Sequence, residues 1–118
     1  MRIISFTEKW DKLNQDIFTT FRYPRKDKDW FLGEIVQVYY KNRSPKRELI
    51  GKAEIIDKQR RTMNWTDNPA FITNREAKED GFMDRNDMEK FIISQYGLNY
   101  PSWFNKLTLK WIEQGAGK

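Results

Sequence analysis

The stretch Ile35-Val36-Gln37-Val38-Tyr39-Tyr40 is β-branched or aromatic at every position except one, a composition typical of a β-strand. Residues 41–46 follow with asparagine, serine and proline among basic residues, which favours a turn. Residues 49–58 form a second strand-like run, and Gly51 within them favours a bulge or a bend. Two strands and a basic turn therefore predict a β-hairpin in the middle of the chain.

Further elements flank this hairpin, and they are predicted from β-branched runs, from capping residues and from apolar residues three or four positions apart. In chain order they are a strand at residues 2–6, a short helix at residues 9–13 capped by Thr7, a strand at residues 17–22, a charged loop at residues 25–29, an irregular crossover at residues 60–74, a helical turn at residues 75–80 closed by Gly81, a helix from the cap Asp84 to Tyr96, and a strand at residues 106–112. In the last strand, Leu107, Leu109 and Trp111 are expected to face the core.

This strand-dominated order with connecting helices predicts an α+β fold, a closed or half-closed mixed β-barrel of about five to six strands with two or three short helices. A chain of 118 residues has the common size of one domain. We therefore expect a single domain at residues 1–113 and a frayed tail at residues 114–118. No apolar run approaches the ~20 residues that span a bilayer, so we expect a soluble, cytoplasmic monomer that does not associate with membranes.

The composition excludes several kinds of chemistry, because the chain contains no cysteine and no histidine. Disulfides, thiolate nucleophiles and metal sites built from these residues cannot form, and the most common general base is missing. We expect no cofactor and no metal. An enzyme built on this chain has to use lysine, serine, threonine, tyrosine or carboxylates.

The charge balance favours an anionic partner. The chain has 22 lysines and arginines against 17 aspartates and glutamates, a formal net charge of +5 and a pI near 9.5. Aromatic residues reach 15%, and their rings can stack on unpaired bases, although rings also fill the core of a small barrel. These observations predict RNA, another single-stranded nucleic acid or a nucleotide as the partner, with an ordinary solvated surface as the alternative.

Three segments carry a resemblance to a known family. They are Thr-Thr-Phe-Arg at residues 19–22, Phe-Leu-Gly-Glu-Ile-Val-Gln-Val at residues 31–38, and Glu-Ala-Lys-Glu-Asp-Gly-Phe at residues 76–82 followed by the helix that Asp84 caps. Their order and spacing resemble those of the ASCH domain, a family related to the PUA-like RNA-binding barrels, over nearly the whole chain. The resemblance implies a PUA-like mixed barrel with a cleft that binds RNA or a nucleotide.

The family pattern Gly-x-Lys-Thr-x-Thr-x-Arg forms the edge of that cleft. When Arg22 is set at its arginine, Thr20 matches the second threonine and Ile17 stands at the lysine. Some small bacterial members are amidohydrolases that deacetylate N4-acetylcytidine, and the resemblance implies the lysine, that threonine and a carboxylate as their catalytic set. For this chain it implies Thr20 as the nucleophile and Glu79 or Asp80 as the carboxylate. A displaced lysine would have to come from another segment, for which the candidates are Lys26, Lys41 and Lys52.

The leading prediction is an RNA- or nucleotide-binding module with a basic cleft, because cations at strand ends and turns hold phosphates by charge-assisted hydrogen bonds. The predicted binding residues are Arg22, Tyr23, Arg25, Lys26, Lys28, Lys41, Lys52 and Trp65. An amidohydrolase that uses Thr20 and Glu79 is the alternative, and a protein-interaction adaptor is the third hypothesis. An enclosed pocket holding Thr20, a lysine amine and a carboxylate would favour the enzyme, whereas an open groove with aligned cations would favour RNA.

Overall fold

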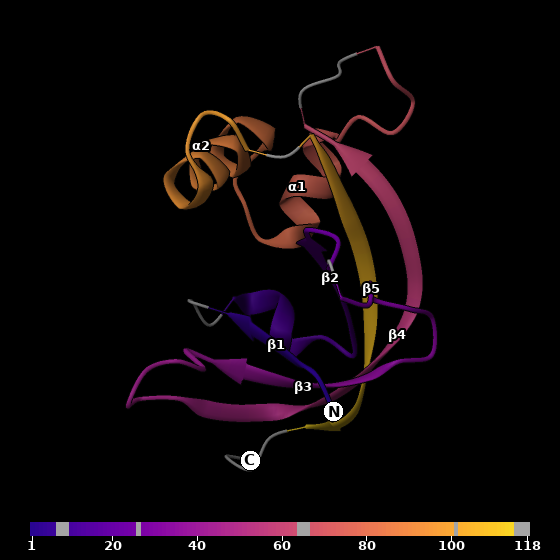
Figure 1. Ribbon diagram of the computed structural model, residues 1–118, viewed down its shortest axis with the longest axis vertical. Coiled ribbons are helices and arrows are strands. Elements are labelled where there is room, and N and C mark those ends of the chain that lie inside the picture. The colour runs from indigo at the N-terminus through magenta and orange to yellow at the C-terminus, as the bar shows by residue number, and fades with distance from the viewer. Residues whose placement is uncertain (7–9, 26, 64–66, 101, 115–118) are drawn as a thin grey trace.

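The computed structural model describes residues 1–6, 10–25, 27–63, 67–100 and 102–114 and shows a small α+β fold (Figure 1). In chain order its elements are β1 (Ile3–Phe6), the 3-10 helix η1 (Asp11–Asn14), β2 (Ile17–Arg22), β3 (Ile35–Tyr40), β4 (Glu48–Thr62), α1 (Asn74–Asp80), α2 (Arg85–Tyr96) and β5 (Trp103–Gln114). The α+β class and the number of strands predicted from the sequence are confirmed within these residues.

The five strands form one sheet in the order β1-β3-β4-β5-β2. β1 pairs with β3 in parallel, and all other neighbours are antiparallel. β4 and β5 are 15 and 12 residues long and bend along their length, so that the sheet curls into a half-barrel (Figure 1). The pairing of β3 with β4 shifts register beside Gly51, an irregularity of the kind that bends strands. The bend expected at this glycine is therefore confirmed.

The molecule has two hydrophobic clusters. The first fills the half-barrel and contains Leu107 and Leu109, which are fully buried, with Trp111 packed against it, so the inward face predicted for the last strand is confirmed. The second lies under the helices and consists of Met63, Ile72, Ala77, Met88, Ile92 and Phe104. Because Phe104 and Leu107 both belong to β5, this strand joins the two clusters.

Both α-helices carry strong end signals. Thr73 and Glu76 form a capping box at the start of α1, and Gly81 ends this helix with a φ of 115°. The side chain of Asp84 accepts a backbone hydrogen bond from the first turn of α2. The helix ends predicted at Gly81, Asp84 and Tyr96 are confirmed. Both helices lie on the concave side of the curled sheet, near the end where β4 finishes and β5 begins (Figure 1).

Strands β4 and β5 are longer than predicted, and the crossover expected from residue 60 begins later. Residues 60–62 belong to β4 and pair with residues 103–105 of β5. The side chains of residues 57–61 are all charged or polar and none of them is buried, so this part of the strand lacks the apolar alternation from which a strand is predicted. At the other end, Gln114 is the last residue of β5 rather than part of a tail.

The helix predicted at residues 9–13 is a short 3-10 helix that follows Trp10 and has no side-chain cap. Leu13 on this helix is buried in the core of the half-barrel. Thr7, the expected cap, lies outside the described residues. None of the helices in the described part of the chain combines the length and the apolarity needed to cross a membrane.

Candidate functional site

A cavity of about 240 Å³ lies between the half-barrel and the helices. Its walls combine charged and polar side chains with a larger number of aromatic rings. The polar residues are Ser5, Lys12, Thr20, Arg22, Asp80 and Gln95, and the aromatic residues are Phe6, Trp10, Phe21, Tyr23, Phe82, Phe91, Tyr96 and Phe104. A cavity whose walls combine aromatic rings with a few placed polar groups is typical of small-molecule sites.

A buried ion pair lies in the wall of this cavity. Nζ of Lys12 on η1 donates to Oδ1 of Asp80 at the end of α1 at 2.7 Å, and the two side chains are only 4% and 7% exposed. Burial lowers the pKa of Lys12 and raises the pKa of Asp80, and in both cases the partner opposes the shift. The two shifts bring the pKa values of the amine and the carboxyl group closer together, so that moving the proton from Lys12 to Asp80 costs less free energy than it would in water.

Close packing at the end of α1 brings Asp80 to Lys12. Gly81 follows Asp80 with a φ of 115°, and a Cβ at this position would lie 2.8 Å from the ring of Trp10. The same ring packs against Phe82, with ring centroids 5.2 Å apart. The glycine therefore allows the segment that precedes η1 to approach α1, and this approach places the two members of the ion pair within hydrogen-bond distance.

Arg22 connects the two edge strands of the half-barrel. Its Nε donates to Oγ1 of Thr20 on β2 at 3.2 Å, and its Nη2 donates to the backbone oxygen of Ser5 on β1 at 3.0 Å. β1 and β2 stand at opposite ends of the sheet order, so the guanidinium spans the open side of the half-barrel. A cation beside the Thr20 hydroxyl stabilises negative charge on that oxygen.

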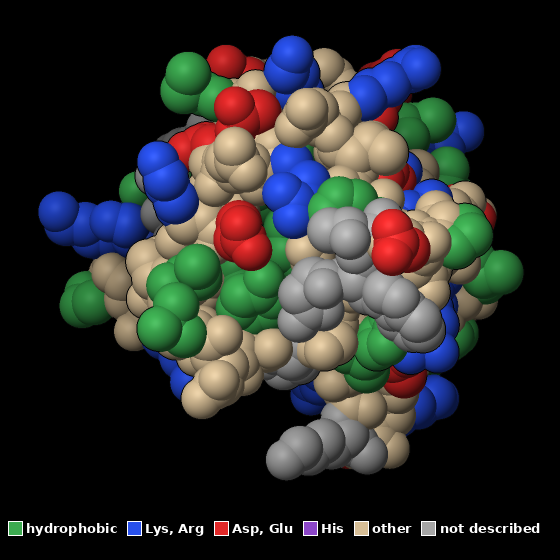
Figure 2. All heavy atoms as spheres, turned by 90° about the horizontal axis from the view of Figure 1, so that it is seen from above, with side chains coloured by type: hydrophobic (Ala, Val, Ile, Leu, Met, Phe, Trp, Pro, Cys, Tyr) green, Lys and Arg blue, Asp and Glu red, His purple; other side chains and the backbone are tan. Residues whose placement is uncertain are grey.

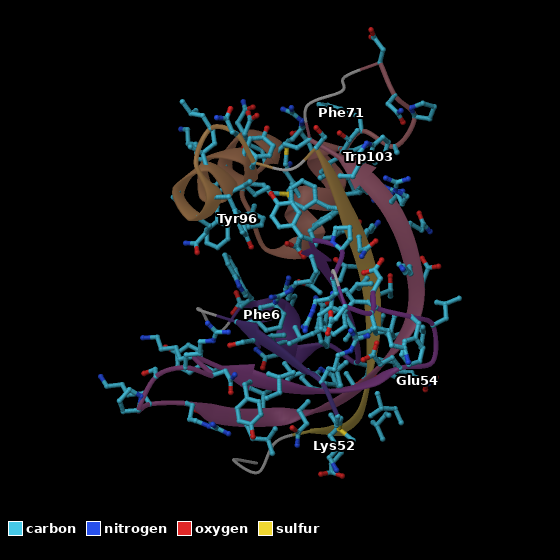
Figure 3. All side chains as sticks on the ribbon, in the orientation of Figure 1. Phe6, Lys52, Glu54, Phe71, Tyr96 and Trp103 are labelled. Atoms are coloured by element: carbon cyan, nitrogen blue, oxygen red, sulfur yellow. The ribbon has the colours of Figure 1, made fainter. Side chains whose placement is uncertain are left out.

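Two cations lie against one aromatic ring at the barrel side of the cavity. Nζ of Lys12 and Cζ of Arg22 are 5.1 Å and 4.8 Å from the centroid of the Phe6 ring. Tyr96 of α2 lies on the facing wall (Figure 3). With Asp80 ionised, the two cations outnumber the carboxylate, so the site carries a net positive charge. Such a site favours an electron-rich or anionic group on the ligand.

Stacked rings form the helical side of the cavity. The rings of Tyr23 and Phe104 are stacked with centroids 4.5 Å apart, and Tyr96 meets Tyr23 edge to face at 4.6 Å. Aromatic walls of this kind offer a large apolar area to a flat ligand. The cavity therefore has a charged side, formed by the half-barrel and the end of α1, and an aromatic side, formed by β5 and α2.

Three residues predicted from the sequence meet at this cavity: Thr20, Arg22 and Tyr23. Of the two candidate carboxylates, Asp80 lines the cavity. Glu79 is exposed and lines a separate groove instead. The structure thus brings together three residues that were considered from the sequence: Thr20, Arg22 and Asp80. The carboxylate is Asp80 and not its neighbour Glu79, which the sequence analysis named first.

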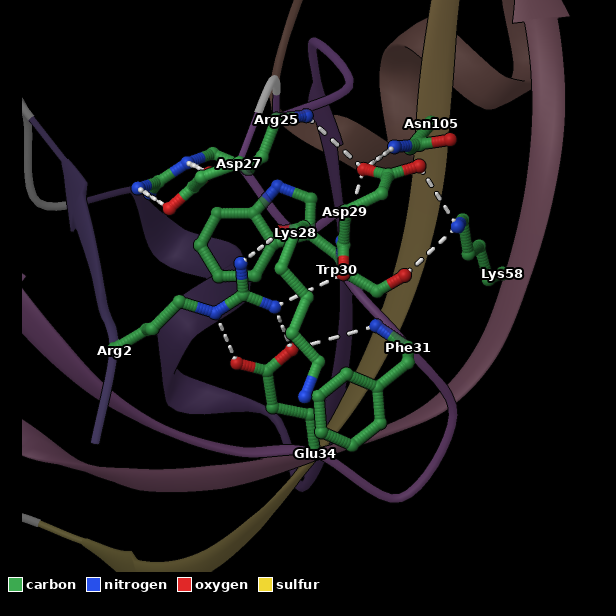
Figure 4. Close-up of polar contacts among 10 residues, drawn as sticks. All are labelled: Arg2, Arg25, Asp27, Lys28, Asp29, Trp30, Phe31, Glu34, Lys58 and Asn105. Carbon is green, nitrogen blue, oxygen red and sulfur yellow. Dashed lines mark hydrogen bonds and ion pairs between the residues drawn. The ribbon is translucent and has the colours of Figure 1, made fainter.

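A polar network holds the loop that follows β2 (Figure 4). Asp29 accepts hydrogen bonds from Nζ of Lys58 at 2.9 Å and from Nδ2 of Asn105 at 2.8 Å. On the other side of the loop, Arg2 pairs with Glu34 and its guanidinium lies 4.5 Å from the ring of Trp30. These contacts fix the loop against β4, β5 and the start of β1.

The two predicted cations of this loop that the structure describes, Arg25 and Lys28, have local partners and do not line the cavity. Arg25 pairs with Asp27 at 3.4 Å, and Nζ of Lys28 lies 4.6 Å from the centroid of the Phe31 ring. Lys41 lies in the turn between β3 and β4, and Lys52 lies on β4 opposite Gln37. The remaining two predicted binding residues, Lys26 and Trp65, lie outside the described residues.

Lys12 is the site residue that the sequence analysis missed. The candidates for a displaced lysine were sought in later segments, whereas the structure places a lysine from η1 in the cavity wall. The one available signal was its position between Trp10 and Leu13, two residues whose burial would carry the lysine toward the interior. Its partner Asp80 is 68 residues away in sequence, and no local pattern predicts that contact.

Among the described residues, no group of three or more acidic side chains is close enough together to hold a metal ion. Comparisons with known proteins give no further assignment. No family model matches the chain, and no curated protein or solved structure matches it.

Proposed function

We propose that the cavity is the active site of a small amidohydrolase, which removes an acyl group from an amino group on a planar, nucleobase-like substrate such as N4-acetylcytidine. The observation that supports this most strongly is the buried pair of Lys12 and Asp80 in the wall of the cavity that Thr20 also lines. A buried ion pair is weak support for folding, because the desolvation of each ion costs several kcal/mol. At the wall of a cavity, such a pair favours a chemical role.

The chemistry assigns one role to each polar side chain. Once the proton of the ion pair has passed from Lys12 to Asp80, the amine of Lys12 accepts the proton of the Thr20 hydroxyl, whose oxygen then adds to the acyl carbonyl carbon. Arg22, which already donates to this oxygen, stabilises the negative charge that develops during addition. Asp80 in its protonated form donates a proton to the leaving nitrogen as the carbon–nitrogen bond breaks. Water then hydrolyses the acyl ester of Thr20, which releases a carboxylic acid and restores the hydroxyl.

The proposal includes membership of the PUA-like ASCH family. The five-stranded half-barrel is compatible with a PUA-like barrel. Thr20 and Arg22 occupy the positions of the family threonine and arginine, and both line the cavity. Ile17 stands at the position of the family lysine and has no amine, and in the proposal Lys12 supplies this group instead. The aromatic side of the cavity suits a flat base, and its charged side suits an acylated amino group.

A nucleotide-binding module without turnover is the second candidate. The hydrogen bonds within the site favour it, because Lys12 and Asp80 satisfy each other and the Thr20 hydroxyl accepts from Arg22. In this state the four side chains form a fixed, charged wall. Such a wall can hold a base and its ribose without any covalent step.

Conversion of N4-acetylcytidine to cytidine and acetate, followed by liquid chromatography, tests the first candidate. Thr20→Val keeps the shape of the side chain and removes the nucleophile, so we expect turnover to fall by at least ~10³-fold. Thr19→Val is the matched control, because Thr19 is the neighbouring residue on β2 and its hydroxyl has no hydrogen-bond partner among the described residues. Equal rates in the two variants would rule out Thr20 as the nucleophile. Tight binding of cytidine without turnover of its acetylated form would support the second candidate.

A further inference from the structure

The turn between β3 and β4 carries a group of unpaired cations. We call residues 41–47 the hairpin tip, and its four exposed cations are Lys41, Arg43, Lys46 and Arg47. None of them forms an ion pair with a carboxylate in the part of the chain that the structure describes. The segment itself contains no acidic residue. In this respect it differs from the loop after β2, where the charges of both signs alternate.

The hairpin tip begins at the wall of the cavity. The backbone N–H of Lys41 donates to the backbone oxygen of Phe6 at 2.8 Å, and the N–H of Asn42 donates to Oγ of Ser5 at 3.0 Å. Ser5 and Phe6 both line the cavity, and the backbone oxygen of Ser5 also accepts from Arg22. Figure 1 shows the turn projecting from the sheet on the side where α2 also lies. A ligand that extends out of the cavity past β1 therefore reaches the hairpin tip first.

Two of the four cations are held on tyrosine rings, and two are not. Arg47 lies 4.8 Å from the ring centroid of Tyr39 and donates to its hydroxyl at 3.1 Å, and Nζ of Lys41 lies 5.4 Å from the centroid of Tyr40. The side chains of Arg43 and Lys46 have no such contact among the described residues. The tip thus presents two cations held on rings at its base and two exposed cations at its end.

Charge on the end of the molecule that carries the helices is more evenly mixed. Figure 2 views the end of the molecule that carries the helices, and on this face the side chains of lysine and arginine alternate with those of aspartate and glutamate. A run of cations without intervening acids complements a polyanion with several phosphates better than it complements a single carboxylate or a neutral ligand. Because the run of cations lies next to the cavity, a polyanion bound to these cations can belong to the same molecule as the ligand inside the cavity.

We propose that the hairpin tip binds the phosphates next to the base in the cavity, so that the substrate is a nucleotide within a single-stranded nucleic acid rather than a free nucleoside. This inference rests on the proposed function of the cavity. A phosphate can also come from a mononucleotide, which carries the same chemistry. Four cations in one turn favour several consecutive phosphates, and the experiment separates the two sources.

The test measures the affinity of three probes at 50 mM and 200 mM salt: cytidine, cytidine monophosphate and a five-nucleotide cytidine RNA. Each phosphate contact on a single strand lowers log K by about 0.7 per unit of log salt. With four contacts, the affinity for the RNA falls about 50-fold over this fourfold range of salt. Cytidine, which has no phosphate, is expected to show almost no salt dependence. Cytidine monophosphate is expected to show the dependence of a single contact.

The matched variants each remove two exposed cations. Arg43→Gln with Lys46→Gln changes the end of the hairpin tip, and Lys90→Gln with Lys110→Gln changes α2 and β5. For the tip variant we expect the salt dependence of RNA binding to drop to about 7-fold, the value for two contacts. The control variant is expected to keep the salt dependence of the unmodified protein.

Equal losses in the two variants, or RNA that binds no more tightly than cytidine monophosphate, would overturn the inference and leave the proposed function of the cavity intact. Conversely, if N4-acetylcytidine is neither bound nor hydrolysed and the RNA still binds through the tip, the proposed function fails while the phosphate contact is supported. Retained binding of cytidine by the tip variant shows that the substitutions leave the fold and the cavity in place.

Discussion

Helix α1 carries two buried carboxylates one turn apart, and their surroundings differ. Glu76 accepts from Nζ of Lys106 at 2.7 Å and from Nε of Arg61 at 2.9 Å, and it also accepts from the backbone amide of Thr73. Burial raises the pKa of Glu76, but these hydrogen bonds outweigh it and leave the pKa below its ordinary value. The carboxylate is therefore held in its ionised form.

Asp80 has a single cation within hydrogen-bond distance, Lys12, and burial dominates, so its pKa lies above its ordinary value. The helix, the residue chemistry and the presence of a lysine partner are the same for both carboxylates. What differs is the number of donors and the degree of burial. Glu76 ties α1 to β4 and β5, whereas Asp80 is placed so that it can exchange a proton. The comparison separates a carboxylate that joins elements of the fold from the one to which we assign a role in the proposed reaction.

The largest effect is expected on turnover. Asp80→Asn removes the proton donor and should lower the hydrolysis of N4-acetylcytidine by about 10²–10⁴-fold, the usual contribution of general acid–base catalysis. Glu76→Gln is the matched change one turn earlier on α1, and it should leave turnover nearly unchanged. The rates are measured under saturating substrate after circular dichroism has shown that both variants are folded. A similar loss in both variants would mean that Asp80 acts only through the stability of α1.

Stability gives the next comparison. Lys12→Met leaves Asp80 buried without its cation, and the loss of one partner from a buried pair costs about 3–5 kcal/mol. Adding Asp80→Leu removes the unpaired carboxyl group and should restore most of this free energy. Lys106→Met should cost less, about 1 kcal/mol, because Glu76 keeps Arg61 as a partner. Urea unfolding measures all three, and a double variant no more stable than Lys12→Met would contradict the account.

The glycine beside Asp80 provides a third test. Gly81→Ala places a Cβ 2.8 Å from the ring of Trp10 at a φ of 115°, so we expect a loss of about 2–4 kcal/mol from strain and overpacking together. Turnover should fall as well, because the ring has to move and η1 carries Lys12. Gly33→Ala is the control, since Gly33 also has a positive φ but a Cβ added at this position would meet no other atom within 4 Å. Its loss should be about 1 kcal/mol and should not affect turnover.

The sequence predicted most of the fold because the relevant signals are local. The β-branched run at residues 35–40, the alternation of Leu107 and Leu109, and the glycine at position 81 each depend on residues close together in the chain, and each prediction is confirmed. The charged end of β4 was missed because its own amino-acid composition does not predict a strand. It forms a strand through its hydrogen bonds to β5. Local propensity reflects the residues of one segment and therefore does not predict a pairing with a distant strand.

The site was predicted only in part for the same reason. Thr20 and Arg22 lie on β2 and Tyr23 follows it directly, and the three residues were found together. Lys12 comes from a segment that precedes them, and Asp80 comes from a helix that follows a long hairpin. The ion pair that joins these two residues is a tertiary contact between distant segments, and no spacing in the sequence predicts it. Predicted cations of the loop after β2 are used by that loop itself, which only the structure reveals.

The smallest expected effect is on the pH dependence of stability, where the two carboxylates have opposite signs. The folded pKa of Glu76 lies below its ordinary value of 4.5, so the stability it contributes is present above that pH and is lost as the pH falls through the folded pKa. The folded pKa of Asp80 lies above its ordinary value of 3.8. Its contribution is therefore fully present below pH 3.8 and is lost as the pH rises through the folded pKa.

Urea midpoints from pH 3 to pH 7 measure this difference. Relative to the unmodified protein, Glu76→Gln should be destabilised most near neutral pH, and the gap should narrow as the pH falls below 4.5. Asp80→Asn should show the reverse, with the gap largest in acid, because the protonated carboxyl group is the form that the buried site favours. Parallel curves for the two variants would mean that both carboxylates are ionised alike in the folded protein, and the proton-donor role of Asp80 would lose its basis.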